Sequence, residues 1–102
     1  MAKIVWTEQS FEDLKDIFDY ISKDSKRYVA NQIRRIKEKT KILKTQLESG
    51  RIVPELGIFE IRELIEGNYR IVYRIIDKQI IQILTIHHSA RDFGSRGFLE
   101  EI

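Results

Sequence analysis

The spacing of apolar residues changes once along this chain, and that change limits the folds open to it. Over residues 8–48 the apolar residues recur every three or four positions, which is typical of amphipathic helices. From Ile58 onward they alternate or run together, which is typical of strands. Residues 3–6 form a short β-branched and aromatic segment that also favours a strand. The pattern predicts an α+β fold in which helices pack on one twisted, largely antiparallel sheet, and the length predicts a single domain over residues 1–102.

Two helices that form an antiparallel hairpin are expected in the first half. The first is predicted over residues 8–23, after an N-cap at Thr7 or Ser10. Its apolar stripe consists of Phe11, Leu14, Ile17, Phe18 and Ile21. The second is predicted over residues 25–48, with Gly50 as a left-handed stop. The link between them is short, so the helices should lie side by side.

Three strands in an antiparallel meander are expected in the second half. They are predicted over residues 58–65, 69–76 and 79–87, with tight turns between them. The last of them is apolar on both faces, so we expect it inside the sheet. Alternation along the second strand places Arg70 and Arg74 on one face.

Composition excludes several classes of protein. The chain has no cysteine, so neither disulfides nor thiolate metal sites are available. The first residues lack the apolar run of a signal peptide, and no segment approaches the roughly 20 apolar residues of a membrane span. We therefore expect a cytoplasmic protein with no membrane partner.

The net charge of +2 is unevenly distributed. Residues 26–51 carry 9 basic and 2 acidic side chains, whereas residues 1–25 carry 3 basic and 6 acidic ones. A local cationic block favours a polyanion or an acidic protein segment as partner. The alternative interpretation is a solvated helix face with its lysines outward.

Four segments carry a resemblance to a known family. They are DLKDIFDYI (13–21), VPELGIFEIREL (53–64), GNYRIVYRI (67–75) and ILTIHHSARDF (83–93). With the Trp6-Thr7 start and the order of predicted elements, they resemble the RelE/ParE superfamily of toxins from type II toxin–antitoxin systems. The resemblance implies a growth inhibitor neutralised by a cognate antitoxin whose flexible segment wraps the toxin. RelE-like members cut messenger RNA on the ribosome, whereas ParE-like members inhibit DNA gyrase.

A RelE-like activity would make this chain a metal-independent endoribonuclease without a cofactor. RNA cleavage of this kind needs activation of the 2′-hydroxyl, stabilisation of charge on the phosphate and a proton for the leaving oxygen. By resemblance, Arg70 matches the arginine of the superfamily's Tyr-Arg motif. Arg62 occupies a cationic position on the preceding strand, and Arg91 matches the basic residue after the last strand. His88 would transfer a proton, alone or with Glu60 or Glu63 as base.

Two departures from the RelE-like pattern favour a ParE-like toxin. Glu60 and Glu63 lie where RelE-like members concentrate lysines, and no tyrosine follows Arg91. Carboxylates at those positions repel a phosphodiester. We therefore expect gyrase poisoning without catalysis. Ribosome-dependent cleavage of messenger RNA and a degenerate, non-toxic binding module are the alternatives.

The same residues also have structural interpretations. The arginines of the meander can form salt bridges across the sheet with Glu60, Glu63 or Asp77. His87 and His88 point to opposite faces of a strand, so they cannot easily bind one metal ion, and no metal site is expected. We expect one histidine to be packed and the other to face the arginines.

Overall fold

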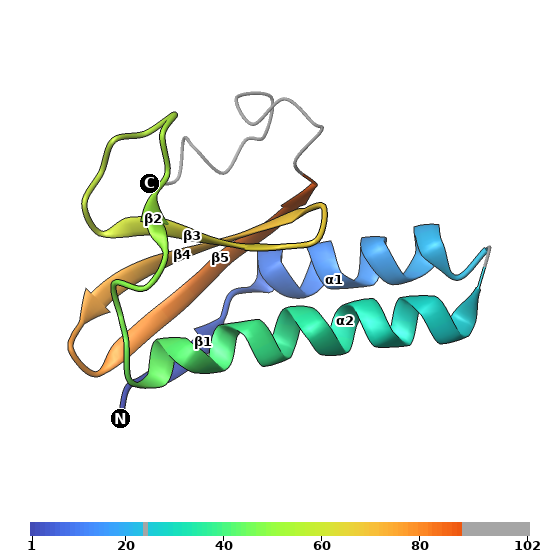
Figure 1. Ribbon diagram of the computed structural model, residues 1–102, viewed down its shortest axis with the longest axis horizontal. Coiled ribbons are helices and arrows are strands. Elements are labelled where there is room, and N and C mark those ends of the chain that lie inside the picture. The colour runs from blue at the N-terminus through green and yellow to red at the C-terminus, as the bar shows by residue number, and fades with distance from the viewer. Residues whose placement is uncertain (24, 89–102) are drawn as a thin grey trace.

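The computed structural model describes residues 1–23 and 25–88, which form a sheet with a pair of helices on one face (Figure 1). In chain order the elements are β1 (Lys3–Trp6), α1 (Glu8–Ile21), α2 (Lys26–Thr40), the 3-10 helix η1 (Lys41–Lys44), β2 (Arg51–Ile52), β3 (Ile61–Glu66), β4 (Tyr69–Asp77) and β5 (Ile80–His88). No helix in the described part of the chain is long and apolar enough to cross a membrane. Arg91 lies outside the described residues.

The sheet confirms the α+β prediction and adds detail to it. Its strand order is β1-β5-β4-β3-β2. β3, β4 and β5 form the expected antiparallel meander, and β5 lies inside the sheet because β1 pairs with it in parallel. β2 is a two-residue edge strand on β3, which the sequence pattern did not predict. The first strand of the meander was predicted to begin at Ile58, but this was wrong, because β3 begins at Ile61. The backbone N–H of Ile61 donates to the carbonyl of Ile58 at 3.1 Å, so the chain still turns there.

The helical hairpin is confirmed, but the second helix is shorter than predicted. α2 ends at Thr40, and the tighter η1 replaces the α-helix predicted as far as residue 48. The Thr40 hydroxyl donates to the Lys37 carbonyl at 2.7 Å, and such bonds compete with the helical ladder. Leu43 on η1 is fully buried, so the tighter turn still contributes to the core.

The buried face of α1 is rotated from the predicted stripe. Phe11 and Phe18 are 57% and 44% exposed, whereas Leu14 and Ile17 are buried. Asp13 causes this rotation, because its carboxylate is buried and accepts hydrogen bonds from the Thr85 hydroxyl and from the backbone N–H of Ile86. These bonds tie α1 to β5. Thr7, one of the two N-caps that the sequence allowed, caps α1, since its hydroxyl accepts from Ser10 N at 3.2 Å.

Apolar side chains fill both faces of the sheet. On the helix side the core joins residues of α1, α2, η1 and the three long strands, among them Leu14, Ile36, Leu43, Ile71 and Ile83. On the other side a smaller cluster of Val53, Ile61 and Val72, with Leu56 and Leu84, lies under the segment 53–60. In Figure 1 that segment projects between β2 and β3 on the side of the sheet away from the helices. It forms one wall of the candidate site.

Gly50 has a different role from the predicted left-handed stop. Among the described residues only Gly57 and Gly67 have positive φ. A Cβ at Gly50 would instead lie 2.5 Å from the Glu63 carbonyl and 2.8 Å from the Tyr73 ring. The buried Tyr73 hydroxyl accepts from Gly50 N at 3.0 Å and donates to the Leu47 carbonyl at 2.9 Å. Burial raises the pKa of Tyr73. The chain therefore needs glycine here for close approach.

Candidate functional site

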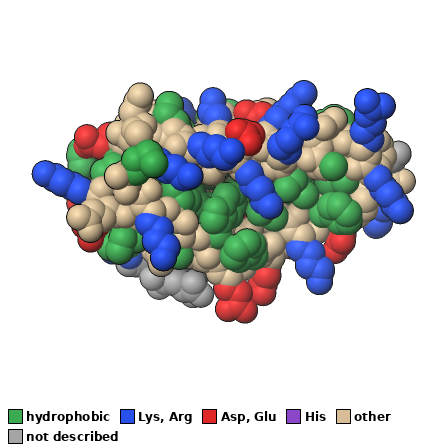
Figure 2. All heavy atoms as spheres, turned by 90° about the horizontal axis from the view of Figure 1, so that it is seen from below, with side chains coloured by type: hydrophobic (Ala, Val, Ile, Leu, Met, Phe, Trp, Pro, Cys, Tyr) green, Lys and Arg blue, Asp and Glu red, His purple; other side chains and the backbone are tan. Residues whose placement is uncertain are grey.

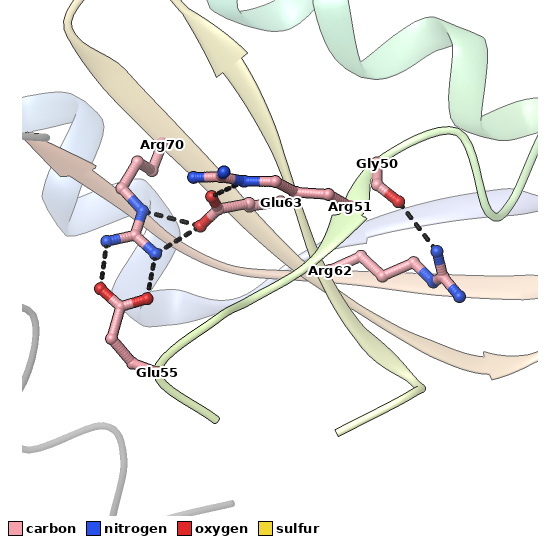
Figure 3. A network of polar contacts seen from close by, with 6 residues as sticks. All are labelled: Gly50, Arg51, Glu55, Arg62, Glu63 and Arg70. Carbon is pink, nitrogen blue, oxygen red and sulfur yellow. Dashed lines mark hydrogen bonds and ion pairs between the residues drawn. The ribbon is translucent and has the colours of Figure 1, made fainter. Parts of the chain in front are cut away.

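Arg70, the strongest sequence candidate, lies on β4 on the sheet face opposite the helices, and its side chain is only 9% exposed. Its Nε donates to Glu63 at 2.7 Å. Its two terminal nitrogens donate to the two carboxylate oxygens of Glu55 at 2.7 Å each (Figure 3). One of these two nitrogens, Nη2, also lies 2.6 Å from a carboxylate oxygen of Glu63. All three guanidinium nitrogens thus contact a carboxylate.

Two further charged side chains complete this arrangement. Glu63 on β3 is fully buried, and its second oxygen accepts from Arg51 Nε at 2.7 Å. Arg51 comes from β2, and Glu55 comes from the segment that follows it. We refer to Arg51, Glu55, Glu63 and Arg70 as the Arg70 cluster. It contains two cations and two anions, so it has no net charge with which to attract a phosphate.

Both Glu55 and Arg70 are charged at neutral pH. Hydrogen bonds from Arg70 lower the pKa of Glu55 from 4.5 to about 2. The bonds to Glu55 and then to Glu63 raise the pKa of Arg70. Bidentate pairs between a guanidinium and a carboxylate are among the strongest polar contacts in proteins. The cluster therefore links the edge of the sheet and the segment 53–60 to β4.

Arg62, the second candidate, is directed away from the Arg70 cluster (Figure 3). It donates to the carbonyls of Gly50 and Phe59, at 3.0 and 3.1 Å. Its guanidinium also lies 4.6 Å from the centre of the Phe59 ring. The side chain is 11% exposed and also lies 3.8 Å from the Glu48 carboxylate, so Arg62 connects the backbone before β2 with the backbone before β3.

The two histidines occupy different faces of β5. His87 is fully buried and lies opposite Arg70 in the β4–β5 register. His88 lies opposite Tyr69, with the ring centres 5.3 Å apart in an edge-on contact. His88 also lines a cavity of about 220 Å³ beside α1, together with Asp13, Asp16, Ile17, Tyr20, Tyr69 and Ile86. The histidine on the arginine face is therefore His87, whereas the sequence candidate was His88.

The structure does not bring the described candidates to one site. Arg70 lies in the Arg70 cluster, and Arg62 donates to the backbone before β2 and before β3. His88 lies beside α1, on the face of the sheet opposite Arg70. Arg91 lies outside the described residues. Within residues 1–23 and 25–88, no group of three or more His, Asp or Glu side chains is arranged to hold a metal ion.

Sequence reasoning anticipated one part of the Arg70 cluster and missed the rest. Salt bridges from the arginines of the meander to Glu60, Glu63 or Asp77 were expected as the structural interpretation, and the structure shows one of them, between Arg70 and Glu63. Glu55 and Arg51 were missed, because they reach the cluster through β2 and the loop after it, which have no periodic pattern. A signal was present in Glu63, a charged residue between Ile61 and Ile65 on a face that is otherwise apolar.

These features define a small α+β protein in which a helical hairpin covers one face of a mixed sheet and a charge-neutral arginine cluster lies on the other. Residues 4–93 match the family described as the ParE toxin of type II toxin–antitoxin systems, parDE. The chain belongs to this family, and it is a ParE-like toxin component of such a system.

Two solved structures share the fold. A chain from the chromosomal ParDE toxin–antitoxin system of P. aeruginosa is 26% identical, with a TM-score of 0.71 over 86% of this chain and 96% of that one. A chain from the YoeB–YefM complex of Staphylococcus aureus is 22% identical, with a TM-score of 0.52 over 86% of this chain and 97% of that one, and this likeness concerns the fold alone. Among curated proteins, none matches the chain.

Proposed function

We propose that this toxin poisons DNA gyrase by binding it, without chemistry of its own, and that a cognate antitoxin neutralises it in the cytoplasm. The observation that supports this most is the state of Arg70. To bind a phosphate, Arg70 would have to leave two carboxylates that contact all three of its nitrogens. A phosphate entering there would also meet the buried charge of Glu63.

The separation of the other candidates supports the same proposal. Metal-free RNA cleavage requires a base, a phosphate clamp and an acid within hydrogen-bond reach of one substrate. Arg62 and His88 point to different parts of the molecule from Arg70 (Figure 3 for Arg62). An assembly of these three groups on one phosphodiester would require the sheet itself to rearrange.

An antitoxin partner is supported by family membership and by the 26% identical relative, which comes from a ParDE toxin–antitoxin system. The expected partner is a small protein encoded beside the toxin gene. Coexpression of that neighbouring frame should restore growth to cells arrested by the toxin. Absence of arrest when the toxin is expressed alone would instead indicate a degenerate binding module.

A supercoiling assay tests the gyrase proposal. Purified toxin at micromolar concentration should stop gyrase from supercoiling relaxed plasmid, and it should cause linear DNA to accumulate when ATP is present. Prior addition of the antitoxin should prevent both effects. Undisturbed supercoiling, together with new 5′ ends in translated messages mapped by primer extension, would establish the ribosome-dependent nuclease instead.

A further inference from the structure

The outer face of α2 and η1 is strongly cationic. Eight Lys and Arg side chains occur between residues 26 and 44, against a single acid, Glu38. All eight are exposed. We call them the basic ridge: Lys26, Arg27, Arg34, Arg35, Lys37, Lys39, Lys41 and Lys44. Figure 2 shows lysines and arginines gathered in a band along one side of the helical face.

The positions of these cations follow from helical geometry. Arg27, Arg34 and Lys41 are seven residues apart, so they lie on one side of the helix about 10 Å from one another. α2 and η1 together extend for about 30 Å, given about 1.5 Å per residue in an α-helix and about 2 Å in a 3-10 helix. Arg27, Arg34 and Lys41 therefore form a row along the exposed side of the helix, and the other five cations of the ridge lie to either side of that row.

The fold makes little use of these charges. The ion pairs among described residues include one on the ridge, Lys41 with Glu38 at 2.9 Å, and both side chains are about 60% exposed. The arginines of the Arg70 cluster, by contrast, are bound to carboxylates. Like charges one turn apart on a helix repel each other. The ridge thus weakens α2 in isolation, and an external anion would relieve that repulsion.

The character of the ridge distinguishes between two kinds of polyanion. Stable protein interfaces have an apolar centre from which charged residues are depleted. On the exposed positions of α2 and η1, the large apolar side chains are Tyr28 and Ile42, and the rest of the surface is mostly charged. A duplex backbone presents a negative charge about every 1.7 Å and is bound by cations without an apolar centre. Charge complementarity therefore favours nucleic acid over an acidic protein.

We infer that the basic ridge binds the phosphate backbone of duplex DNA, independently of base sequence. Under the gyrase proposal, on which this second step rests, the toxin would contact the DNA segment held by the enzyme as well as the enzyme itself. DNA binding by the toxin alone does not depend on that proposal. It can be measured without gyrase, so the failure of one proposal leaves the other testable.

The experiment is a fluorescence-anisotropy titration of a labelled 30-bp duplex with the full-length toxin at several salt concentrations. Contact with about five phosphates predicts a slope of about −4.5 for log K against log salt, at about −0.9 per phosphate. The triple variant Arg34→Gln, Lys37→Gln, Lys44→Gln leaves the Lys41–Glu38 pair intact. It should bind at least tenfold more weakly at 0.1 M salt, with a slope about three units shallower.

A matched control carries the same loss of charge elsewhere. Lys15, Arg74 and Lys78 are exposed cations on α1, β4 and the β4–β5 turn. Their triple change to Gln should alter duplex affinity no more than about threefold, and circular dichroism should show both variants folded. Three results would overturn the inference: no binding of the duplex at 50 mM salt, equal weakening by the two triple variants, or tighter binding of poly-glutamate than of the duplex.

Discussion

Arg70→Gln is expected to destabilise the fold by about 3 kcal/mol, because removal of one partner leaves a buried charge without its counter-ion. The charge left behind is Glu63, whose side chain is fully buried. Arg51 would still donate to Glu63, which keeps the loss at the lower end of the range for buried pairs. Glu55 is 43% exposed and returns to water, so its pair with Arg70 contributes less than about 1 kcal/mol.

Urea unfolding at pH 7, followed by circular dichroism, measures this loss directly. For a domain of this size, about 3 kcal/mol corresponds to a fall in Tm of more than about 10 °C. Arg74→Gln, an exposed arginine on the same strand, is the matched control and should change the free energy of unfolding by no more than about 0.5 kcal/mol. The double change Arg70→Met, Glu63→Leu should recover most of the stability, since apolar residues can replace a buried ion pair at little cost.

Two results would refute this reasoning. A loss below about 1 kcal/mol in Arg70→Gln would mean that the Arg70 cluster does not hold the sheet edge in place. A variant that is folded and binds antitoxin, yet no longer arrests growth, would mean that Arg70 acts on the target directly.

Three further predictions concern neighbouring contacts. The stabilisation from Glu55 is complete above its unfolded pKa of 4.5 and is lost as the pH falls toward about 2. Glu55→Gln should therefore cost less than about 1 kcal/mol at pH 7 and almost nothing at pH 2, and a pH-independent difference in urea unfolding would contradict this. Gly50→Ala should cost about 3 kcal/mol, because the added Cβ would clash with the Glu63 carbonyl. Gly57→Ala should cost only about 1 kcal/mol, because Gly57 lies in open space and its strain comes from φ +64° alone. Equal losses of Tm in the two variants would be inconsistent with close approach at Gly50. Asp13→Ala should cost about 2–3 kcal/mol, because it removes the carboxylate that accepts from the Thr85 hydroxyl and the Ile86 N–H. Glu12→Ala, a change at an exposed neighbour, should alter the free energy of unfolding by no more than about 0.5 kcal/mol. Similar denaturation midpoints for the two variants would exclude an anchoring role for Asp13.

Local signals predicted the elements of this fold well. The strand at Lys3–Trp6, the Thr7 cap and the antiparallel meander all follow from side-chain periodicity or from one residue and its neighbours. The end of α2 and the position of the edge strand β2 do not follow from such local signals. They depend on where Leu43 and Val53 are buried once the chain has turned back onto the sheet, and no periodic pattern contains that information.

Local signals were also insufficient to predict the ion pairs of the candidate site. Alternation placed Arg70 on one face of β4, and pairing across adjacent strands indicated Glu63 as one of three possible acidic partners for the arginines of the meander. It did not indicate that Glu55 would approach from a loop and occupy the remaining nitrogens of Arg70. The difference between an arginine available to a phosphate and one bound to two carboxylates therefore depends on a long-range contact.

The central claim is that the toxin acts on gyrase without cleaving RNA. The most direct test compares wild-type toxin with His88→Ala, Arg91→Ala, a double variant that removes two of the nuclease candidates. The amount of plasmid linearised by gyrase, at equal toxin concentration, should agree within about twofold between the two proteins. Loss of both growth arrest and messenger RNA cleavage in the variant, with no linear DNA formed by the wild-type toxin, would contradict the account.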